Sequence, residues 1–352
     1  MGVKTTESAV KKCVLVMQDY LTKRKSSLFT EKFLKKKQMS NLFELVGNTP
    51  LVELGGLCPQ KPNVKIFAKL EMYNPTASVK ARAAAHILQT AEKEGLLRAG
   101  SVILDASSGN TGIAYAALAS AKGYKLKLCL PSNINKERKG LLRAYGVDCI
   151  YTSPLEGSDG AIRKARQLAA ENPTWFYCDQ YSNDANWKAH YEGTGPEIWQ
   201  QTKQLITHFV SSLGTSGTFV GTSRYLKQVS NDRVKCYSVE PDSPFHGLEG
   251  MKHMETAIVP KIYDPTIADE ALEAPTEESF ALLRHVAKTQ GLLIGPSCAA
   301  ALYGALTIAQ TISNGTIVVI FPDSGERYLS EPHLWKEDDE DSNFLQEYQL
   351  QR

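Results

Sequence analysis

The chain has 352 residues, of which 42% are hydrophobic and 22% charged, and its formal net charge is +2. This length is sufficient for a large hydrophobic core divided between two domains. The small net charge argues against nucleic acid as the main partner. Apolar runs stay short of the roughly 18 residues that a membrane span needs, so we expect no membrane partner.

The cysteines and the first residues indicate a cytoplasmic protein. Seven cysteines are scattered along the chain without a Cys-x-x-Cys pair. An odd number of scattered cysteines is typical of reduced thiols and gives no support to a metal or haem site. The N-terminal residues include lysines but lack the apolar stretch of a secretory signal. We therefore expect a cytoplasmic location and no metal ion.

The two ends of the chain differ in charge. Residues 1–40 carry ten Lys and Arg against three acidic residues, whereas residues 333–352 carry two basic and six acidic residues. Solvated extensions explain this composition. A second hypothesis is that the ends contact each other, a neighbouring subunit or a protein partner.

The first strongly patterned region places a lysine at the start of a helix. An apolar strand is expected at 64–70 and an alanine-rich helix at 83–94, with an Asn-Pro turn between them and Ser78 as a possible N-cap. Lys80 at this helix start could form a Schiff base with a carbonyl compound such as pyridoxal phosphate. The helix dipole would favour the neutral amine that this chemistry requires. A solvated lysine would give the same local pattern.

From residue 63 onward, apolar strands alternate with helical segments. This alternation predicts parallel sheets covered by helices, with ligands bound beyond the carboxyl ends of the strands. The expected strands span 64–70, 102–106, 126–130, 148–151, 208–211, 234–239 and 316–321, and the helices that follow the first one span 113–121, 161–170, 277–290 and 299–312.

Three polar motifs each follow one of these strands. They read Ser-Ser-Gly-Asn-Thr-Gly at 107–112, Gly-Thr-Ser-Gly-Thr at 214–218 and Pro-Asp-Ser-Gly-Glu-Arg-Tyr at 322–328. Because all three lie at strand ends, we expect them to share one site with Lys80. The turn at 214–218 precedes a helix, and glycines and hydroxyls at such a position are suited to bind a phosphate.

Taken in this order, the four motifs resemble fold-type II pyridoxal-phosphate (PLP) enzymes, specifically the cysteine synthase and cystathionine β-synthase group. The resemblance covers about residues 41–332. It implies an α/β fold of the tryptophan synthase β type, with two domains of parallel-type sheets and helices and with PLP in the cleft between them. The expected domains are 41–183 and 184–332, with part of 51–73 crossing into the second, and with 1–40 and 333–352 as extensions.

The resemblance also assigns cofactor contacts. Lys80 would be the Schiff-base anchor and the base that removes the α-proton, Asn110 would contact the phenolic oxygen, and Ser324 would meet the pyridine nitrogen. A hydroxyl cannot keep that nitrogen protonated, which favours β-elimination and replacement. The cofactor phosphate would bind Gly214, Thr215, Ser216, Gly217 and Thr218.

Substrate contacts are implied in the same way. The substrate carboxylate would bind Ser107, Ser108, Gly109, Thr111 and Gln180. Residues 247–254 resemble the cysteine synthases that prefer O-phosphoserine and take sulfur from a small carrier protein. Lys252 would there neutralise the leaving phosphate, with an ordinary solvated lysine as the alternative.

Two positions depart from the family pattern. Ser107 stands where threonine is frequent, and Ala81 replaces the usual acid of Lys-Asp-Arg, which leaves Arg82 without its nearest expected partner. Lys-x-Arg also occurs in the dehydratases and racemases of this fold. Those enzymes show His after Ser-Gly-Asn and a tetraglycine phosphate loop, whereas this chain has Thr111 and Gly-Thr-Ser-Gly-Thr.

We therefore expect a homodimeric enzyme that makes L-cysteine by PLP-dependent β-replacement through an α-aminoacrylate. O-phosphoserine is the favoured substrate and O-acetylserine the second. Condensation of serine with homocysteine to cystathionine is one alternative, and a different nucleophile is another. A non-catalytic scaffold is the alternative of another class, suggested by Ala81 and the unusual ends.

Overall fold

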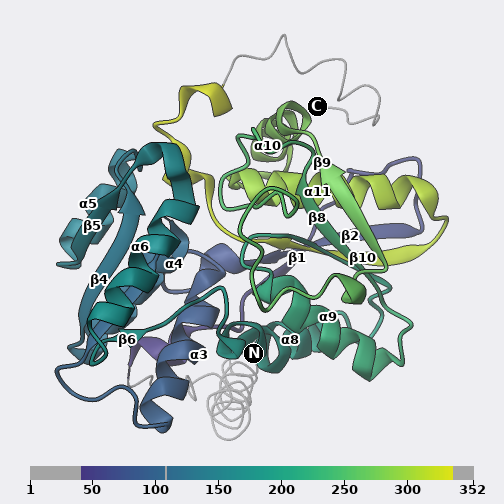
Figure 1. Cartoon of the computed structure of the whole chain (residues 1–352). Helices are drawn as coiled ribbons and strands as arrows, with labels where there is room; N and C mark the ends of the chain where they lie inside the picture. The colour runs from purple at the N-terminus through teal and green to yellow at the C-terminus, as the bar shows by residue number, and fades with distance from the viewer. Residues whose placement is uncertain (1–40, 108, 336–352) are drawn as a thin grey trace, which may run out of the picture. The chain divides into compact units, whose positions relative to one another are not determined.

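The computed structural model describes residues 41–107 and 109–335, and within them the strands form two sheets (Figure 1). The larger sheet is parallel except for its edge strand β1, which runs antiparallel to β2. Its strands, in spatial order, are β1 (Leu51–Glu53), β2 (Val64–Leu70), β10 (Gly315–Phe321), β7 (His208–Ser212), β8 (Lys235–Pro241) and β9 (Glu270–Ala274).

The smaller sheet is parallel throughout. Its strands, in spatial order, are β5 (Asp148–Thr152), β4 (Lys125–Pro131), β3 (Val102–Ala106) and β6 (Phe176–Tyr177). The α/β class with parallel-type sheets is thus confirmed. Strands β1 and β2 come early in the chain but pair within the larger sheet, whose other strands come from residues after 207. The domain boundary near residue 183 stays a prediction.

Helices cover both faces of each sheet (Figure 1). Strand β10 shows why: Ile317 and Val319 pack in the core beneath α10 and α11, while Val318 and Ile320 pack against α8 and α9. A strand buried on both faces needs a continuous apolar run, as β10 has. The helices are α3 (Lys80–Lys93), α4 (Asn110–Lys122), α5 (Lys136–Ala144), α6 (Gly157–Glu171), α7 (Asp184–Ala189), the π-helix η4 (His190–Thr194), α8 (Gly195–Gln201), α9 (Gly217–Ser230), α10 (Thr276–Gln290) and α11 (Pro296–Thr311).

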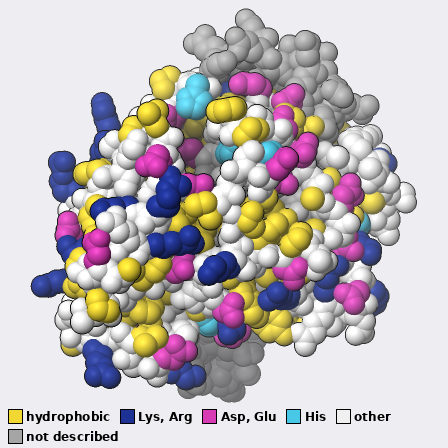
Figure 2. Space-filling view, viewed as in Figure 1, with side chains coloured by type: hydrophobic (Ala, Val, Ile, Leu, Met, Phe, Trp, Pro, Cys, Tyr) yellow, Lys and Arg dark blue, Asp and Glu magenta, His cyan; other side chains and the backbone are white. Residues whose placement is uncertain are grey.

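The surface carries both signs of charge. On the face shown in Figure 2, Lys and Arg side chains are interspersed with Asp and Glu and do not gather into one patch of a single sign. Mixed charge of this kind creates no extended positive field for a polyanion on that face. A helix with the length and apolar character of a membrane span is absent from residues 41–107 and 109–335.

Candidate active site

A pocket of about 710 Å³ lies at the carboxyl ends of strands from both sheets. Ser107 after β3, Ser212 at the end of β7 and Pro322 after β10 all line it. A volume of a few hundred Å³ or more at the ends of parallel strands is typical of a small-molecule site. The pocket contains members of all four sequence motifs, so the expectation of a single shared site agrees with its lining.

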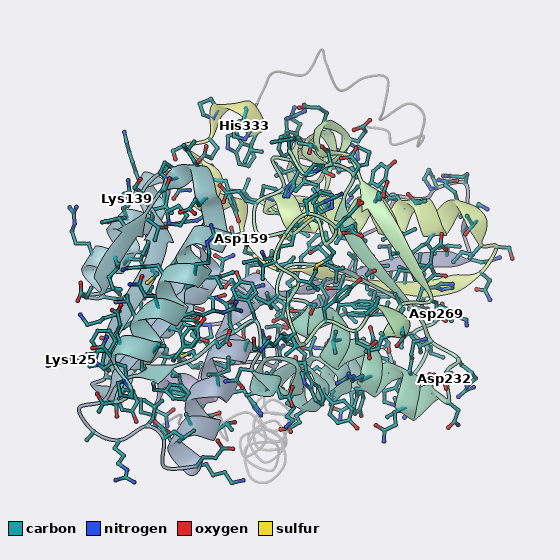
Figure 3. The ribbon with its side chains drawn as sticks, viewed as in Figure 1. Lys125, Lys139, Asp159, Asp232, Asp269 and His333 are labelled. Carbon is teal, nitrogen blue, oxygen red and sulfur yellow. The ribbon has the colours of Figure 1, made fainter. Side chains whose placement is uncertain are left out.

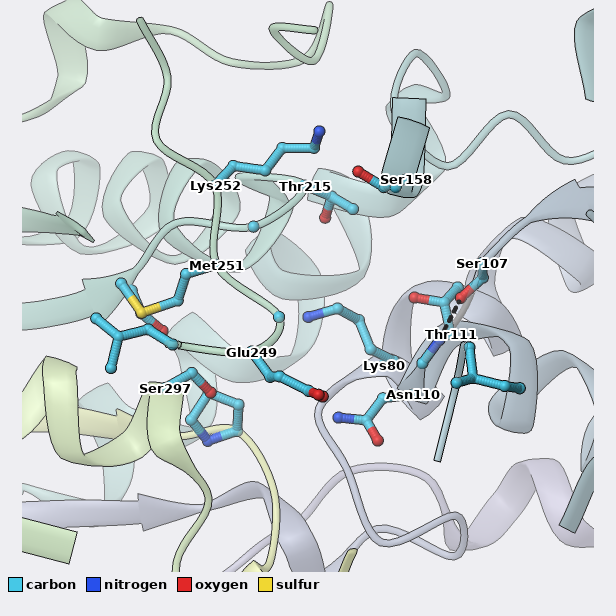
Figure 4. A pocket seen from close by; sticks show the side chains of 18 of the residues that line it. Lys80, Ser107, Asn110, Thr111, Ser158, Thr215, Glu249, Met251, Lys252 and Ser297 are labelled. Atoms are coloured by element: carbon cyan, nitrogen blue, oxygen red, sulfur yellow. Dashed lines mark hydrogen bonds between the residues drawn. The ribbon is translucent and has the colours of Figure 1, made fainter. Parts of the chain in front are cut away.

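Lys80 is the first residue of α3, and its side chain extends into this pocket (Figure 4). The start of α3 is fixed to the end of β10, because Val79 N donates to Pro322 O at 2.8 Å and Ser78 forms an isolated antiparallel bridge with Asp323. Burial lowers the pKa of the Lys80 amine, and the negative charges of Asp323 and Glu71 counteract this only in part. A lowered pKa favours the neutral amine that a nucleophile or base requires.

The N-cap expected at Ser78 is wrong. Val79 is the N-cap residue of α3, without a side-chain cap hydrogen bond. The Ser78 hydroxyl is buried and has no partner among the described residues. Pairing of residue 78 with the chain after β10 holds the start of the helix in place, so the serine does not cap it.

The loop after β3 brings several predicted residues to the pocket. Ser107, Gly109, Asn110 and Thr111 line it, whereas Ser108 lies outside the described residues. The Ser107 hydroxyl accepts from Gly112 N at 2.9 Å, so it stabilises the first turn of α4. The sequence analysis assigned the Ser107 hydroxyl to the substrate, but in the structure this hydroxyl holds the loop after β3 in its conformation.

Asn110 is held at both ends of its amide. Its Nδ2 atom donates to Asp323 Oδ2 at 2.6 Å, and Arg327 donates to its Oδ1 atom. Asp323 also accepts from the Tyr328 hydroxyl at 2.6 Å. The third motif therefore orients Asn110 instead of contributing Ser324 to the pocket.

Gln180 lies at the base of the pocket, only 2% exposed. Its Nε2 atom donates to Ala106 O at 2.8 Å, and its backbone carbonyl accepts from Asn186 Nδ2 at 2.7 Å. These bonds join the end of β3 to α7.

The loop before α9 has the features of an anion site. Gly214, Thr215, Ser216 and Thr218 line the pocket. Ser216 has φ of 68°, and its hydroxyl is buried without a partner among the described residues. Helix α9 starts here without a side-chain cap, so its N-terminal dipole faces the pocket unneutralised by a carboxylate.

Gly217 does not line the pocket but permits the loop to pack. A Cβ atom at this residue would lie 2.0 Å from Asn186 Oδ1, so the Asn186 side chain would have to move. Gly214 is constrained similarly, since a Cβ would lie 2.4 Å from Gly250 O. The two glycines thus have packing roles that bring the loop against α7 and against residues near 250.

Comparison with known proteins identifies the family. Residues 42–323 match the family described as pyridoxal-phosphate dependent enzyme. This chain belongs to that family. A cysteine synthase of Aquifex aeolicus is 44% identical over 302 residues, which are 84% of this chain and 92% of that protein. The chain accordingly falls in the cysteine synthase group of these PLP-dependent enzymes.

Two solved structures agree with this assignment. A cysteine synthase from Entamoeba histolytica matches with a TM-score of 0.83 and 33% identity, covering 90% of this chain and 97% of the other. An O-acetylserine dependent cystathionine β-synthase from Helicobacter pylori matches with a TM-score of 0.78 and 33% identity, covering 83% and 98%.

The residues present fit PLP. The unpartnered Ser216 hydroxyl and the open start of α9 provide donors for a phosphate, and Lys80 lies in the same pocket as a covalent attachment point. The pocket does not support the alternative of a non-catalytic scaffold, because the residues that PLP chemistry needs lie in one pocket. Of the ends on which it also depended, residues 1–40 and 336–352 lie outside the described residues.

Ser324 is not among the residues that the structure brings to the pocket. Among the described residues the pocket lining includes Ser297 but not Ser324. The Ser324 hydroxyl instead faces the backbone, donating to Leu293 O at 3.4 Å and accepting from Glu326 N at 3.3 Å. Ser297 lies in the first turn of α11 after a Gly-Pro pair, a helix-start signal that could have identified it.

Lys252 does line the pocket and is 8% exposed. It belongs to residues 246–254, which we call the mouth segment. Its Nζ atom lies 3.2 Å from Asp159 Oδ1, near the start of α6 (Figure 3), and 5.3 Å from the centre of the Tyr181 ring. The solvated-lysine alternative does not fit this burial.

Arg82 is not left without a partner by Ala81. It donates to Glu71 at 2.7 and 2.9 Å and to Glu197 at 2.7 Å with each of two nitrogens. Lys69 joins the same cluster through Glu197 at 2.7 Å. Arg82 thus has carboxylate partners without an acid at residue 81, one from Glu71 eleven residues earlier and one from Glu197 115 residues later.

Sequence reasoning missed one basic residue of the pocket. Arg138, in the first turn of α5, lines the pocket and pairs with Glu249 of the mouth segment. No motif marks Arg138, because its role depends on a partner more than a hundred residues away. Groups of three or more His, Cys, Asp or Glu that could hold a metal ion do not occur within residues 41–107 and 109–335.

Proposed function

We propose that the protein makes L-cysteine by replacing the β-substituent of an activated L-serine with a sulfur nucleophile. O-phosphoserine is the favoured substrate and O-acetylserine the second. The observation that carries the reaction is the presence of Lys80, the 107–111 loop and the 214–218 loop in one pocket. The observation that carries the substrate preference is a buried Lys252 in the same lining.

The chain's own residues divide the work. Lys80 would attach the cofactor and, as a neutral amine, take the proton from the substrate α-carbon. PLP when bound would supply the electron sink for charge that develops at that carbon. The 214–218 loop would bind the cofactor phosphate, and Ser297 would take the place that the sequence assigned to Ser324 beside the pyridine nitrogen.

The substrate is oriented by the other side of the pocket. Backbone amides and hydroxyls of residues 107–111, with Gln180, would hold its carboxylate. Lys252 would neutralise the phosphate as it leaves, because a cation stabilises developing negative charge most strongly in a partly desolvated site. Asp159 holds the Lys252 ammonium in place until then.

The substrate preference is tested by replacing Lys252 with Ala. We expect kcat/KM for O-phosphoserine with sulfide to fall about 10- to 100-fold, and that for O-acetylserine less than threefold, since one charge-assisted hydrogen bond is lost. Lys261→Ala is the matched control, because Lys261 is an exposed lysine nearby in the chain. Equal losses on both substrates would refute the phosphate role of Lys252.

Product analysis separates the remaining alternatives. One solved relative is named an O-acetylserine dependent cystathionine β-synthase, so homocysteine should be offered beside sulfide. The proposal expects cysteine as the main product, and preferential formation of cystathionine would contradict it. A homodimer and a small sulfur-carrier protein as donor complete the proposal, and light scattering of the purified protein tests the first.

A further inference from the structure

Arg138 is a buried cation at the pocket that the reaction outlined above does not use. It lies in the first turn of α5, where Asn135 caps the helix by accepting from Arg138 N at 3.0 Å. Its side chain is 9% exposed, and its guanidinium lies 5.4 Å from the centre of the Tyr328 ring. Packing therefore holds the group in one position at the edge of the pocket.

The hydrogen-bonding capacity of Arg138 is only partly used. One terminal nitrogen donates to the Glu249 carboxylate, but the Nε–H group is buried without a partner among the described residues. Buried N–H groups almost always find an acceptor. A guanidinium offers parallel donors that suit two oxygens of one carboxylate or phosphate group. The Nε–H is thus one donor of Arg138 that no acceptor among the described residues satisfies.

Glu249 is a much less firmly held partner. Its side chain is 41% exposed, compared with 9% for that of Arg138. It extends into the pocket that also contains Lys80 and Asn110 (Figure 4). An exposed carboxylate can be exchanged for another anion at small cost, because water already solvates it.

The mouth segment contributes the carboxylate of one ion pair and the ammonium of another. Glu249 pairs with Arg138 of α5, and Lys252 of the same segment pairs with Asp159 of α6. The segment is also attached to the residue that precedes the proposed phosphate loop, because Lys252 N donates to Leu213 O at 2.9 Å. An anion that displaces Glu249 would therefore act on a segment that contacts both sides of the site.

We propose that Arg138 binds the phosphate of the substrate, and that Glu249 occupies Arg138 until that phosphate displaces it. This rests on the proposed preference for O-phosphoserine. The phosphate is the expected group because the substrate carboxylate already has its candidate partners in the 107–111 loop. Both residues then determine substrate specificity, because Arg138 attracts the phosphate and Glu249 competes with the phosphate for Arg138.

Replacing Glu249 tests the proposal, because a purely structural role of the Arg138–Glu249 pair would not give the result expected below. We expect the Glu249→Gln holoenzyme to bind inorganic phosphate about three- to tenfold more tightly by calorimetry, because a competing charge is gone. Arg138→Gln should weaken phosphate binding about tenfold or more. In the double variant, the Glu249 change should have no further effect, since the group for which it competes is absent.

Kinetics with two substrates distinguish the phosphate from the carboxylate. O-phosphoserine and O-acetylserine carry the same carboxylate, and only the first carries phosphate. We expect Arg138→Gln to raise KM about tenfold for O-phosphoserine and less than twofold for O-acetylserine, with Arg138→Lys intermediate. Equal losses on both substrates, or a Glu249→Gln effect that persists without Arg138, would overturn the proposal.

The outcome is separable from that of the proposed function. A wild-type enzyme that works only with O-acetylserine would refute the substrate preference, and phosphate binding would still report on Arg138. If instead O-phosphoserine is preferred while phosphate affinity is unchanged in both single variants, the preference stands and the Arg138 inference fails.

Discussion

Two clusters of charged residues in this molecule are both held by ion pairs between basic side chains and carboxylates, but they differ in how deeply these side chains are buried. Around Arg82, the side chains of Lys69 and Glu71 are fully buried and Glu197 is 15% exposed. At the pocket mouth the cations are buried, but their carboxylates on Glu249 and Asp159 are 41% and 26% exposed. The Arg82 cluster is largely closed to solvent, whereas each mouth pair has a carboxylate that water reaches more freely.

The difference teaches which pairs are structural and which can be exchanged. Removing one partner from a buried cluster leaves an uncompensated charge, and this is strongly destabilising. Removing a partly exposed partner leaves a charge that water or an anionic ligand can approach. We therefore expect the Arg82 cluster to determine stability and the mouth pairs to determine substrate binding.

Arg82→Met should have the largest effect on stability. The substitution leaves Glu71 buried without its bidentate partner, so the free energy of unfolding should fall by about 3–5 kcal/mol. Urea denaturation of the holoenzyme measures this. Adding Glu71→Gln should restore part of the loss, because the stranded charge is removed. A loss below about 1 kcal/mol would abolish the distinction between the two clusters.

Acid should weaken the same cluster. Burial alone would raise the pKa of Glu197, but hydrogen bonds and charges from Arg82 and Lys69 lower it to about 2. A lowered carboxyl pKa contributes stability above the ordinary pKa near 4.5, and that contribution is lost as the pH falls toward 2. Glu197→Gln should be less stable than wild type at pH 7, and denaturation series should show the difference shrinking between these pH values. A difference independent of pH would contradict this origin.

Asp159→Asn should have a small effect on stability. It releases Lys252 from its partner, but the aspartate is partly exposed, so the expected change in unfolding free energy is below about 1 kcal/mol. Affinity for O-phosphoserine should rise, because the Lys252 ammonium no longer has a competing carboxylate. Thermal denaturation with and without O-phosphoserine measures both quantities. A large destabilisation with unchanged affinity would place this pair with the Arg82 cluster.

An ion pair with both side chains about half exposed should show the smallest effect. Arg163 and Glu156 are 55% and 50% exposed. Arg163→Gln should change the free energy of unfolding by less than about 0.5 kcal/mol, and kinetic constants should not change. A larger effect on either would mean that exposure is a poor guide to the roles assigned above.

Local patterns predicted most of the fold. The strand at 316–321 was recognisable because burial on both faces demands an unbroken apolar run, and the observed β10 begins one residue earlier. Helices α7 and α8 were not predicted. Gly193 lies in the π-helix η4, whereas Gly195 and Pro196 begin α8, and a Cβ at Gly195 would lie 2.7 Å from Tyr225 Cβ. Close packing on α9 requires that glycine, and sequence spacing does not show it.

The residues of the site likewise differ in whether a local sequence pattern marks them. Lys80 and the 214–218 loop were found because each has a local signal, a strand end followed by a helix start. Ser297 was missed in favour of Ser324, because only the folded chain shows which of two serines near α11 and β10 lines the pocket. Arg138 was missed because its meaning depends on Glu249, which lies 111 residues further along the chain.

The most direct test is the visible absorption spectrum of the purified protein, recorded with Lys80→Ala alongside and titrated with O-phosphoserine and then with O-acetylserine. Wild type should carry the absorption band of covalently attached PLP, which the variant lacks, and the band should change at lower concentrations of O-phosphoserine than of O-acetylserine. An unaltered band with O-phosphoserine, or the same band in Lys80→Ala, would contradict the roles proposed for Lys252 and Lys80 respectively.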